Sequence, residues 1–341
     1  MDEIHAPAPR QLLGREQVLR PAPANLKEGD EALFQHEYAR EIGPTVLLEK
    51  REVHVLANGF LISRGLLLPE SFVNPPRGGR RLKAFARMIQ YRVFSRESRV
   101  SRALFVTDEF SNGYFHWICD VLPRLEALGS AGAAGRTLLV PAMANFHYVP
   151  QTIEPFTMAD VRLLDWAERV FCRELLVVSP AAPTGNYRSS LMGALRNRMR
   201  GHFGARSAGR RIYISRGGAA VRRIANEEEI LPLLERFGFE TIRTEGLSFA
   251  EQVRAIGSAS VLASNHGAGL TNMCWMRPGS KVLELRKDGD RDNNCYYSLA
   301  AALGIRYHYL CCRATPEHSE AHTADLLVDG PRLEGELAAL G

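Results

Sequence analysis

Two residues that could move a proton stand four positions apart in the segment GYFHWICDVLPRL. On a helix, this spacing places the side chains of His116 and Asp120 on one face. A carboxylate beside an imidazole orients the ring and raises its basicity, which is what the deprotonation of a hydroxyl group requires. A capped, partly buried histidine is the alternative interpretation. We predict that His116 and Asp120 form a catalytic pair in which either residue is the base.

The neighbours of this pair could meet a second substrate, the one that accepts a transferred group. Asn112 and Tyr114 precede His116, and Trp117 follows it. Aromatic side chains can line a sugar site, although on a helix they belong more often to the hydrophobic core. We assign Asn112, Tyr114 and Trp117 to the acceptor side of the site.

A glycine-rich turn later in the chain has the pattern of a phosphate-binding site. In SNHGAGLTN a predicted strand runs into Gly267 and Gly269 and then into a short helix. Backbone N–H groups at a helix start bind phosphate, and glycines let the anion come close. A tight turn without a ligand is the alternative. The predicted contacts to a diphosphate are Asn265, His266, Gly267, Ala268, Gly269, Leu270, Thr271 and Asn272.

The same turn begins the pattern of a dinucleotide-binding protein but does not complete it. Asn272 stands where the third glycine of that pattern is required. The acidic residue, Glu284, lies inside the following predicted strand rather than at its end. An NAD-dependent oxidoreductase is therefore kept as an alternative function, and a non-catalytic carbohydrate-binding protein as another.

Arginines follow a predicted strand in YISRGGAAVRRIANEEE. Arg216 directly follows the strand, and the carboxyl ends of strands in α/β sheets face the crevice where ligands bind. Fixed guanidinium groups and a helix N-terminus can neutralise a leaving diphosphate without a metal. Pairing of Arg222 and Arg223 with Glu227–Glu229 is the alternative. We predict that Arg216 and Arg223 bind the phosphorylated ligand.

An acidic segment, KDGDRDNN, predicts the opposite chemistry. Asp288, Asp290 and Asp292 are spaced like a metal-binding motif and could carry Mg²⁺ or Mn²⁺. Asn293 and Leu299 stand where a calcium loop needs its glycine and its later acidic residue. We prefer a solvated turn, and no residue is assigned to a metal.

His116 and Asp120 must be positioned by the elements around them. The sequence predicts antiparallel strands followed by a parallel α/β sheet in this part of the chain. β-branched and alternating runs predict the strands, and apolar residues at helical spacing predict the helices. The predicted strands cover 45–63, 66–73, 103–110, 136–143 and 174–180, and the predicted helices cover 81–96 and 111–128.

A second, clearer βα series must position the glycine turn and Arg216. Asn226 and the acids after it predict a capped helix start, and Gly238 predicts its end. The predicted strands cover 210–216, 239–243, 260–266 and 281–286, and the predicted helices cover 189–203, 226–238, 249–259 and 267–276.

Composition limits the class of protein. The 341 residues are 45% hydrophobic and 24% charged, which is typical of a globular chain of one large or two smaller domains. No apolar run approaches a transmembrane length, and the first residues lack the apolar stretch of a signal peptide, so we expect a cytoplasmic protein. The six cysteines contain no C-x-x-C pair, which favours reduced, mostly buried thiols.

Basic charge is concentrated in two stretches, although the formal net charge is only +5. Ten basic residues and two acids lie between Arg64 and Arg102, and ten arginines without an acid lie between Arg188 and Arg223. No nucleic-acid-binding motif accompanies them, so we expect no nucleic acid partner. Small phosphorylated ligands or an anionic membrane surface fit this charge.

In their order and spacing, three segments resemble glycosyltransferase family 61, which includes bacterial capsular-polysaccharide-type, plant xylan-decorating and animal O-linked N-acetylglucosaminyl transferases. They are GYFHWICDVLPRL, YISR followed by RRIANEEEI and GFE, and SNHGAGLTNMCWMRPGSKVLEL. The resemblance implies a GT-B fold, in which two Rossmann-like domains face a central cleft. It also implies an inverting reaction, no obligatory metal or other cofactor, and a nucleotide-sugar donor, with a UDP-sugar favoured.

The resemblance also implies roles for residues and a division of the chain. Arg216 and the 266–269 turn would lie at the donor diphosphate, Glu284 close to the nucleoside, and His116 with Asp120 at the acceptor. The ranges that we predict are an N-terminal arm (1–44), an acceptor-side domain (45–185), a nucleotide-sugar-binding domain (186–312) and a C-terminal tail or helix (313–341).

A setting for the enzyme follows as a hypothesis. A transferase of bacterial type would act in surface-polysaccharide synthesis on a saccharide or lipid-linked acceptor. The basic stretch between Arg64 and Arg102 would then touch anionic head groups at the inner face of the membrane.

Overall fold

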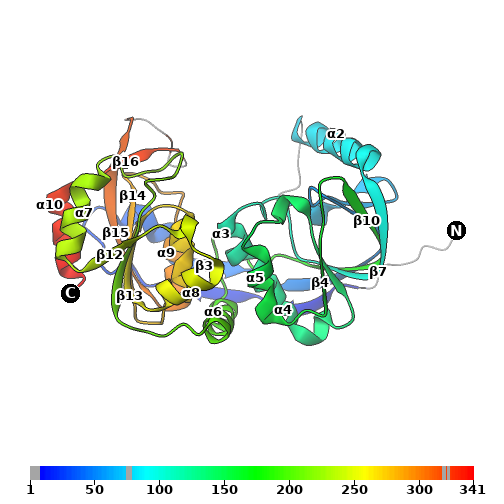
Figure 1. Cartoon of the computed structure of the whole chain (residues 1–341), viewed down its shortest axis with the longest axis horizontal. Coiled ribbons are helices and arrows are strands. Elements are labelled where there is room, and N and C mark those ends of the chain that lie inside the picture. Colours follow the sequence, from blue (N-terminus) through cyan, green and yellow to red (C-terminus); the bar gives the residue numbers. More distant parts are fainter. Residues whose placement is uncertain (1–7, 74–78, 317–319, 321–322) are drawn as a thin grey trace. The chain divides into compact units, whose positions relative to one another are not determined.

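The computed structural model describes residues 8–73, 79–316, 320 and 323–341, which form two compact units (Figure 1). Unit 1 is Met1–Glu16 with Gly43–Pro183, and unit 2 is Gln17–Ile42 with Thr184–Gly341. The division at Pro183 lies close to the predicted domain boundary at residue 185. The α/β class is confirmed, because each unit combines a mainly parallel or mixed sheet with helices. The GT-B arrangement of the units stays a prediction.

Unit 1 is built on a mixed sheet in the order β6-β5-β4-β10-β7-β8-β9, with β1 paired to β4. The strands β10, β7, β8 and β9 are parallel, whereas β4 pairs antiparallel with β10, β5 and β1. The antiparallel strands predicted at the start of this unit are therefore present. The strands are β1 (Arg10–Leu13), β4 (Thr45–Leu56), β5 (Leu61–Ser63), β6 (Leu66–Leu67), β7 (Arg96–Phe105), β8 (Thr137–Val140), β9 (Asp160–Leu163) and β10 (Glu168–Val178).

The helices of unit 1 include one long surface helix and one interrupted helix after β7. The surface helix is α2 (Gly79–Phe94), close to the predicted 81–96. The interrupted helix follows a loop and consists of α3 (Tyr114–His116), the π-helix η3 (Trp117–Val121) and α4 (Leu122–Ala133). The predicted end at Gly129 is a kink with a φ of 67°, beyond which helix continues to Ala133. The shorter helices are η2 (Pro69–Ser71), η4 (Ala142–Ala144), α5 (Val149–Ile153) and η5 (Glu154–Phe156).

Unit 2 is built on a sheet in the order β12-β11-β13-β14-β15-β16, in which only β16 is antiparallel to its neighbour. The chain runs from β11 outward to β12 and then back across to β13. Ligands bind in α/β sheets at this kind of reversal, outside the carboxyl ends of the strands. The strands are β11 (Arg210–Ile214), β12 (Phe239–Ile242), β13 (Ala259–Asn265), β14 (Lys281–Lys287), β15 (Arg306–Thr315) and β16 (Asp325–Leu327).

Helices cover both faces of this sheet (Figure 1). On one face, α7 (Glu227–Arg236) and α10 (Gly330–Ala339) pack with the sheet into a hydrophobic core that includes Tyr213, Leu283 and Leu333. On the other face lie α6 (Ser189–Phe203), α8 (Phe249–Gly257) and α9 (Cys295–Leu303). The sheet is therefore buried on both faces, which agrees with its continuous apolar strands.

The Asn226 side chain does not cap α7 as predicted. Its amide nitrogen donates to the carbonyl oxygen of Val328, and its amide oxygen accepts from the Val328 backbone N–H at 3.0 Å. The side chain thus bonds to both backbone groups of Val328, as a neighbouring strand would, in the segment after β16. The start of α8 is capped instead by Ser248 and Glu251, which form a reciprocal capping box.

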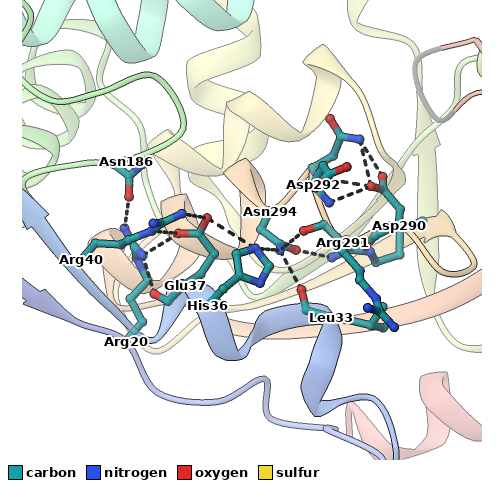
Figure 2. Close-up of polar contacts among 12 residues, drawn as sticks. Arg20, Leu33, His36, Glu37, Arg40, Asn186, Asp290, Arg291, Asp292 and Asn294 are labelled. Carbon is teal, nitrogen blue, oxygen red and sulfur yellow. Dashed lines mark hydrogen bonds and ion pairs between the residues drawn. The ribbon is translucent and has the colours of Figure 1, made fainter.

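Most of the predicted N-terminal arm is a folded part of unit 2. The segment 17–42 contains α1 (Glu31–Phe34), η1 (Gln35–Glu37) and β3 (Ala39–Ile42), which pairs with β2 (Glu16–Leu19). Figure 2 shows Asn294 donating to the carbonyl oxygen of Leu33 at 2.8 Å and Arg20 bonded to Glu37 and Asn186. The prediction of a loosely ordered arm is wrong for this segment. The prediction relied on the Pro and Ala content, and composition does not indicate the long-range hydrogen bonds that hold the segment in place.

The C-terminal residues also belong to unit 2 rather than to a separate tail. The predicted boundary at residue 312 falls inside β15, and α10 contributes Leu333 and Leu337 to the core. The boundary was predicted from short-range patterns, which place the end of the domain at the last clear βα repeat. These patterns do not indicate the antiparallel edge strand β16.

The six cysteines are free, five of them buried and Cys295 half-buried. Burial raises the pKa of the Cys172 thiol to about 12, and the charge of Arg162 lowers it only in part. The prediction that the thiols are mostly buried is confirmed, and their reduced state stays a prediction.

Candidate functional site

In a sheet of this topology the ligand crevice is expected outside the carboxyl ends of β11 and β13, where the order of the strands reverses. The Ser264 hydroxyl donates to the carbonyl oxygen of Ile214 at 2.8 Å and ties the two strand ends together. Asn265 is fully buried, and its amide nitrogen donates to the carbonyl oxygen of Arg222. The side chains of Ser264 and Asn265 therefore shape the two loops that border the crevice, whereas the Asn265 side chain was predicted to contact a ligand.

Arg216 lies in this crevice against the glycine turn. A Cβ atom on Gly267 would stand 2.9 Å from Nη1 of Arg216, so any other residue would displace the guanidinium from this position. The guanidinium donates to the carbonyl oxygens of Arg222 and Val221 at 3.3 and 3.5 Å, and no carboxylate of the described residues forms an ion pair with it. Burial lowers the pKa of Arg216 and the nearby charge of Arg222 lowers it further, whereas the charge of Glu245 raises it in part. A half-buried cation that is not bonded to a carboxylate of the described residues is suited to an anionic ligand.

His266 begins the turn and is held from behind by Glu284 of the neighbouring strand. Nδ1 of His266 lies 2.5 Å from Oε1 of Glu284, and the backbone N–H of His266 donates to the carbonyl oxygen of Leu285. Its side chain is 12% exposed, whereas that of Glu284 is completely buried. The ring is therefore fixed in orientation while one edge stays accessible.

Glu284 is part of a buried chain of hydrogen bonds. The hydroxyl of Tyr307 donates to Oε2 of Glu284 at 2.5 Å, and Arg286 contacts the same hydroxyl at 3.3 Å. Burial raises the pKa of Glu284, but His266, Arg286 and the Tyr307 hydroxyl together lower it by more than burial raises it. The pKa of Glu284 therefore lies below the ordinary value. The carboxylate of Glu284 is enclosed by protein groups, and its closeness to the nucleoside stays a prediction.

The rest of the predicted turn serves mainly to build the crevice. Gly267 and Gly269 are buried, as are Leu270, Thr271 and Asn272, while Ala268 is half-exposed. The Asn272 side chain donates to the carbonyl oxygen of Gly269 and accepts from the indole of Trp275. These bonds hold a 3₁₀ helix, η7 (Ala268–Trp275), in place of the predicted ordinary helix. Leu270 and Asn272 are thus structural, and His266 and Ala268 are the partly exposed residues of the turn.

Arg223 does not belong to the crevice. Its guanidinium bonds to Oδ2 of Asp325 at 3.0 Å, and its backbone N–H donates to Oδ1 of the same residue. The sequence offered Glu227–Glu229 as partners, but the partner comes from β16, about a hundred residues away. Glu227 accepts instead from Tyr213 and Ser215 at 2.7 and 2.8 Å.

The acidic segment 288–292 forms a turn organised by its own hydrogen bonds (Figure 2). Asp290 accepts from the backbone N–H groups of Asp292 and Asn293 and from the Asn293 amide at 2.8 Å. Arg286 donates to the carbonyl oxygen of Asp290 at 2.6 Å. Within the described part of the chain, no three or more acidic, histidine or cysteine side chains gather as metal ligands.

In unit 1, His116 and Asp120 form the predicted pair. Nδ1 of His116 lies 2.7 Å from Oδ2 of Asp120 across the junction of α3 and η3. The ring stacks on Phe110 with centroids 5.4 Å apart, and the side chains of His116 and Asp120 are 27% and 10% exposed. Because Nδ1 faces the carboxylate, Nε2 is the nitrogen available to a substrate hydroxyl.

A buried ion pair that the sequence did not indicate fixes the loop before His116. Asp108 and Arg124 form a close ion pair, and both side chains are almost fully buried. The other carboxylate oxygen of Asp108 accepts from the backbone N–H of Phe110 and from the Ser111 hydroxyl. The only sequence signals were an acid after a strand and an arginine within an apolar helix, which are too common to single out.

The predicted acceptor-side residues divide into two groups. Asn112 is exposed, and Tyr114 is half-buried with its ring edge-on to Tyr148 at 5.1 Å. Trp117 is fully buried, and its indole N–H donates to the hydroxyl of Thr152 at 2.8 Å. Trp117 therefore belongs to the core of unit 1, as the alternative interpretation of helical aromatics allowed.

A glycine turn and an unpaired guanidinium at the reversal point of a doubly wound sheet define an α/β protein of the kind that binds phosphorylated ligands. The family described as Glycosyltransferase 61 matches residues 114–283, from the His116 segment to the end of the glycine-turn segment. The chain belongs to this glycosyltransferase family.

The names of two curated relatives describe the transfer of N-acetylglucosamine. Over 106 residues the chain is 35% identical to the protein O-linked-mannose β-1,4-N-acetylglucosaminyltransferase 2 of Tetraodon nigroviridis. Over 98 residues it is 33% identical to the EGF domain-specific O-linked N-acetylglucosamine transferase of Drosophila melanogaster. These matches cover 30% and 28% of this chain and 18% of each relative, so the chain spans less than a fifth of the relatives it matches.

Proposed function

We propose that the chain is an inverting, metal-independent glycosyltransferase that moves a sugar from a nucleotide-sugar donor to a hydroxyl group of a saccharide or lipid-linked acceptor. Unit 2 binds the donor diphosphate in the crevice between β11 and β13. Unit 1 supplies the base that takes the acceptor proton. The single observation that carries the proposal is the position of Arg216, which is half-buried against Gly267 and forms no ion pair with a carboxylate of the described residues.

The reaction is a direct displacement at the anomeric carbon. The acceptor oxygen forms the new C–O bond while the bond from the anomeric carbon to the donor phosphate breaks. The hydroxyl proton passes to Nε2 of His116, whose imidazolium Asp120 stabilises through Nδ1. Arg216 and the N–H groups of the turn stabilise the charge of the departing nucleoside diphosphate, the role that a metal ion plays in other transferases.

The donor sugar to test first is N-acetylglucosamine carried by UDP. The printed names of the relatives describe N-acetylglucosaminyl transfer, and a UDP-sugar is the donor that we favour. We further propose bacterial surface-polysaccharide synthesis at the cytoplasmic face of a membrane, which the basic stretch of unit 1 supports through its charge. Turnover of UDP-N-acetylglucosamine that is unchanged by EDTA would support the metal-independent mechanism, and a requirement for Mn²⁺ would overturn it.

Titration calorimetry with UDP, GDP, CMP and NAD tests the donor site. We expect one nucleoside phosphate to bind and Arg216→Ala to weaken it by roughly 10- to 100-fold, because a charge-assisted hydrogen bond is lost. Arg223→Ala is the matched control, since it removes an arginine of the same segment that pairs with Asp325. The control should bind like the wild type.

Two outcomes would contradict this assignment of the site. Equal affinity of Arg216→Ala and the wild type would remove Arg216 from the donor site. Binding of NAD without any of the nucleoside phosphates would favour the oxidoreductase that the first part of the glycine pattern suggested.

A further inference from the structure

The surface helix α2 of unit 1 carries apolar side chains on a face that no part of the described chain covers. Leu82, Phe85, Ile89 and Val93 repeat at spacings of three and four residues, so they form one stripe along the helix. Their exposed fractions are 74%, 51%, 45% and 65%. Phe94 at the end of the helix is 80% exposed. An exposed run of this size is unusual and marks an interaction surface.

This stripe is separate from the face by which α2 is anchored to unit 1. Ala84 and Met88 are buried and pack in a cluster with Leu56, Phe60 and Ile62. The helix thus has two apolar faces, one used in the fold and one presented outward. Folding alone explains the first face and leaves the second unexplained.

Two basic side chains of α2 accompany the stripe without an ion pair among the described residues. They are Lys83 and Arg87, and both are exposed. Arg96 and Arg99 on the adjoining strand form ion pairs with Asp165 and Glu97 at 3.6 and 3.3 Å, although their side chains stay 82% and 77% exposed. No acidic residue occurs within α2 itself. Around the helix, Lys83 and Arg87 lie between the exposed stripe and the anchored face.

We propose that α2 docks unit 1 onto an anionic lipid bilayer, with the apolar stripe in the acyl boundary and Lys83 and Arg87 at the head groups. Charge complementarity favours this partner, since anionic lipids attract exposed lysine and arginine while the acyl region accepts leucine, phenylalanine and isoleucine. The 16 residues of α2 extend about 24 Å, too short to cross a bilayer, and no helix of the described chain has the length and apolarity to do so. The helix lies along the membrane surface.

This docking rests on the membrane location proposed above and assigns it to a surface of unit 1, without depending on the donor site. It would hold the His116 side of the enzyme at a surface that carries lipid-linked acceptors. Vesicle binding is measured without a nucleotide, so failure of the donor site and failure of the docking are distinguishable.

Vesicle flotation of the full chain tests the proposal, with phosphatidylcholine vesicles against vesicles of equal parts phosphatidylcholine and phosphatidylglycerol. We expect the wild type to bind the anionic vesicles at least tenfold more strongly. The variant Leu82→Ser/Phe85→Ser/Ile89→Ser should lose at least tenfold in binding, because the apolar contacts are gone. The variant Lys83→Glu/Arg87→Glu should lose a similar amount, at roughly fivefold per basic residue.

Matched controls separate the surface from a general effect of charge or apolarity. Arg206→Glu/Arg313→Glu reverses two exposed arginines of unit 2, and Trp166→Ser removes an exposed aromatic residue of unit 1. Both should bind anionic vesicles like the wild type. Circular dichroism and UDP calorimetry should show that every variant is folded and binds the nucleotide unchanged.

A reporter at Phe85 gives a second readout. In a Trp166→Phe background, Phe85→Trp should shift its emission to the blue on anionic vesicles and be quenched by brominated acyl chains. Equal binding to both kinds of vesicle, or wild-type binding by the triple serine variant, would overturn the proposal. A wild-type dimer that the serine variant dissociates, without any vesicle binding, would identify a second copy of the chain as the partner and also overturn it.

Discussion

Each unit contains a histidine bonded to a carboxylate, and the two pairs are built in different ways. His116 and Asp120 are four residues apart on one helical segment, and both retain some exposure. His266 and Glu284 come from neighbouring strands, and Glu284 is completely buried with Tyr307 and Arg286 behind it. The first pair has the accessibility that proton transfer needs, whereas the second has the rigidity that an anion-binding turn needs.

This contrast shows that the same two side chains serve different purposes according to what surrounds them. A carboxylate that keeps some exposure, such as that of Asp120, can stabilise an imidazolium that forms during turnover. A buried carboxylate fixed by several donors holds its histidine in one orientation, and its loss costs stability. The following substitutions would break or sharpen this division, in order of the expected effect.

Replacing His116 by alanine should lower turnover by roughly 10²–10⁴-fold, because the general base is removed. Donor affinity should change by less than about twofold, and the free energy of unfolding by less than about 1 kcal/mol, since the pair is partly exposed. Steady-state kinetics, calorimetry and urea denaturation measure the three quantities. Wild-type turnover in His116→Ala would remove His116 as the base, and the same result in Asp120→Asn would show that the carboxylate is dispensable.

Replacing His266 by alanine should mainly destabilise the fold, by about 3 kcal/mol, because the buried Glu284 charge loses a partner. Urea denaturation at neutral pH measures this loss against His116→Ala as the matched histidine variant. The division between the pairs fails if the two substitutions lower stability equally.

Replacing Glu284 by glutamine keeps the shape of the side chain but removes its charge. This substitution should lower the free energy of unfolding by about 2 kcal/mol, in a pH-dependent way. The folded-state pKa of Glu284 lies below the ordinary value of 4.5, so its charge stabilises the fold above that pH. This contribution is lost as the pH falls through the folded-state pKa. Urea denaturation from pH 7 to pH 3 should show the wild type converging on the variant at low pH. A constant difference would mean that Glu284 acts through packing alone.

Replacing Trp117 by phenylalanine should have the smallest effect, a loss of about 1 kcal/mol in unfolding free energy from the missing bond to Thr152. The KM for the acceptor should stay unchanged, because the side chain is buried in the core. Thermal denaturation and acceptor saturation kinetics provide the measurements. A several-fold rise in acceptor KM would return Trp117 to the acceptor side.

Local patterns in the sequence were sufficient for the features that depend on neighbouring residues. The spacing of His116 and Asp120 predicted their contact, and glycines after a strand predicted the turn at Gly267. Apolar runs predicted both series of strands, including the antiparallel ones that open unit 1. Helical spacing and strand burial act over a few residues, so a sequence carries them directly.

Long-range pairing was decided by the tertiary structure. Arg223 pairs with Asp325 rather than with the nearby glutamates, and the side chain of Asn226 bonds to the backbone of Val328. The segment 17–42 joined unit 2 through Asn294 and β15, which no local pattern indicates.

By itself, the sequence determined the α/β class, the glycine turn, the helical histidine pair and the family resemblance, because each depends on residue types at short spacing. Only the tertiary structure decided that Glu284 supports His266 from within the core, and that Arg216 lies unpaired against Gly267. It also decided that one face of α2 stays exposed. Burial and pairing depend on which distant strands and helices come together, and a side chain acquires its role from that packing.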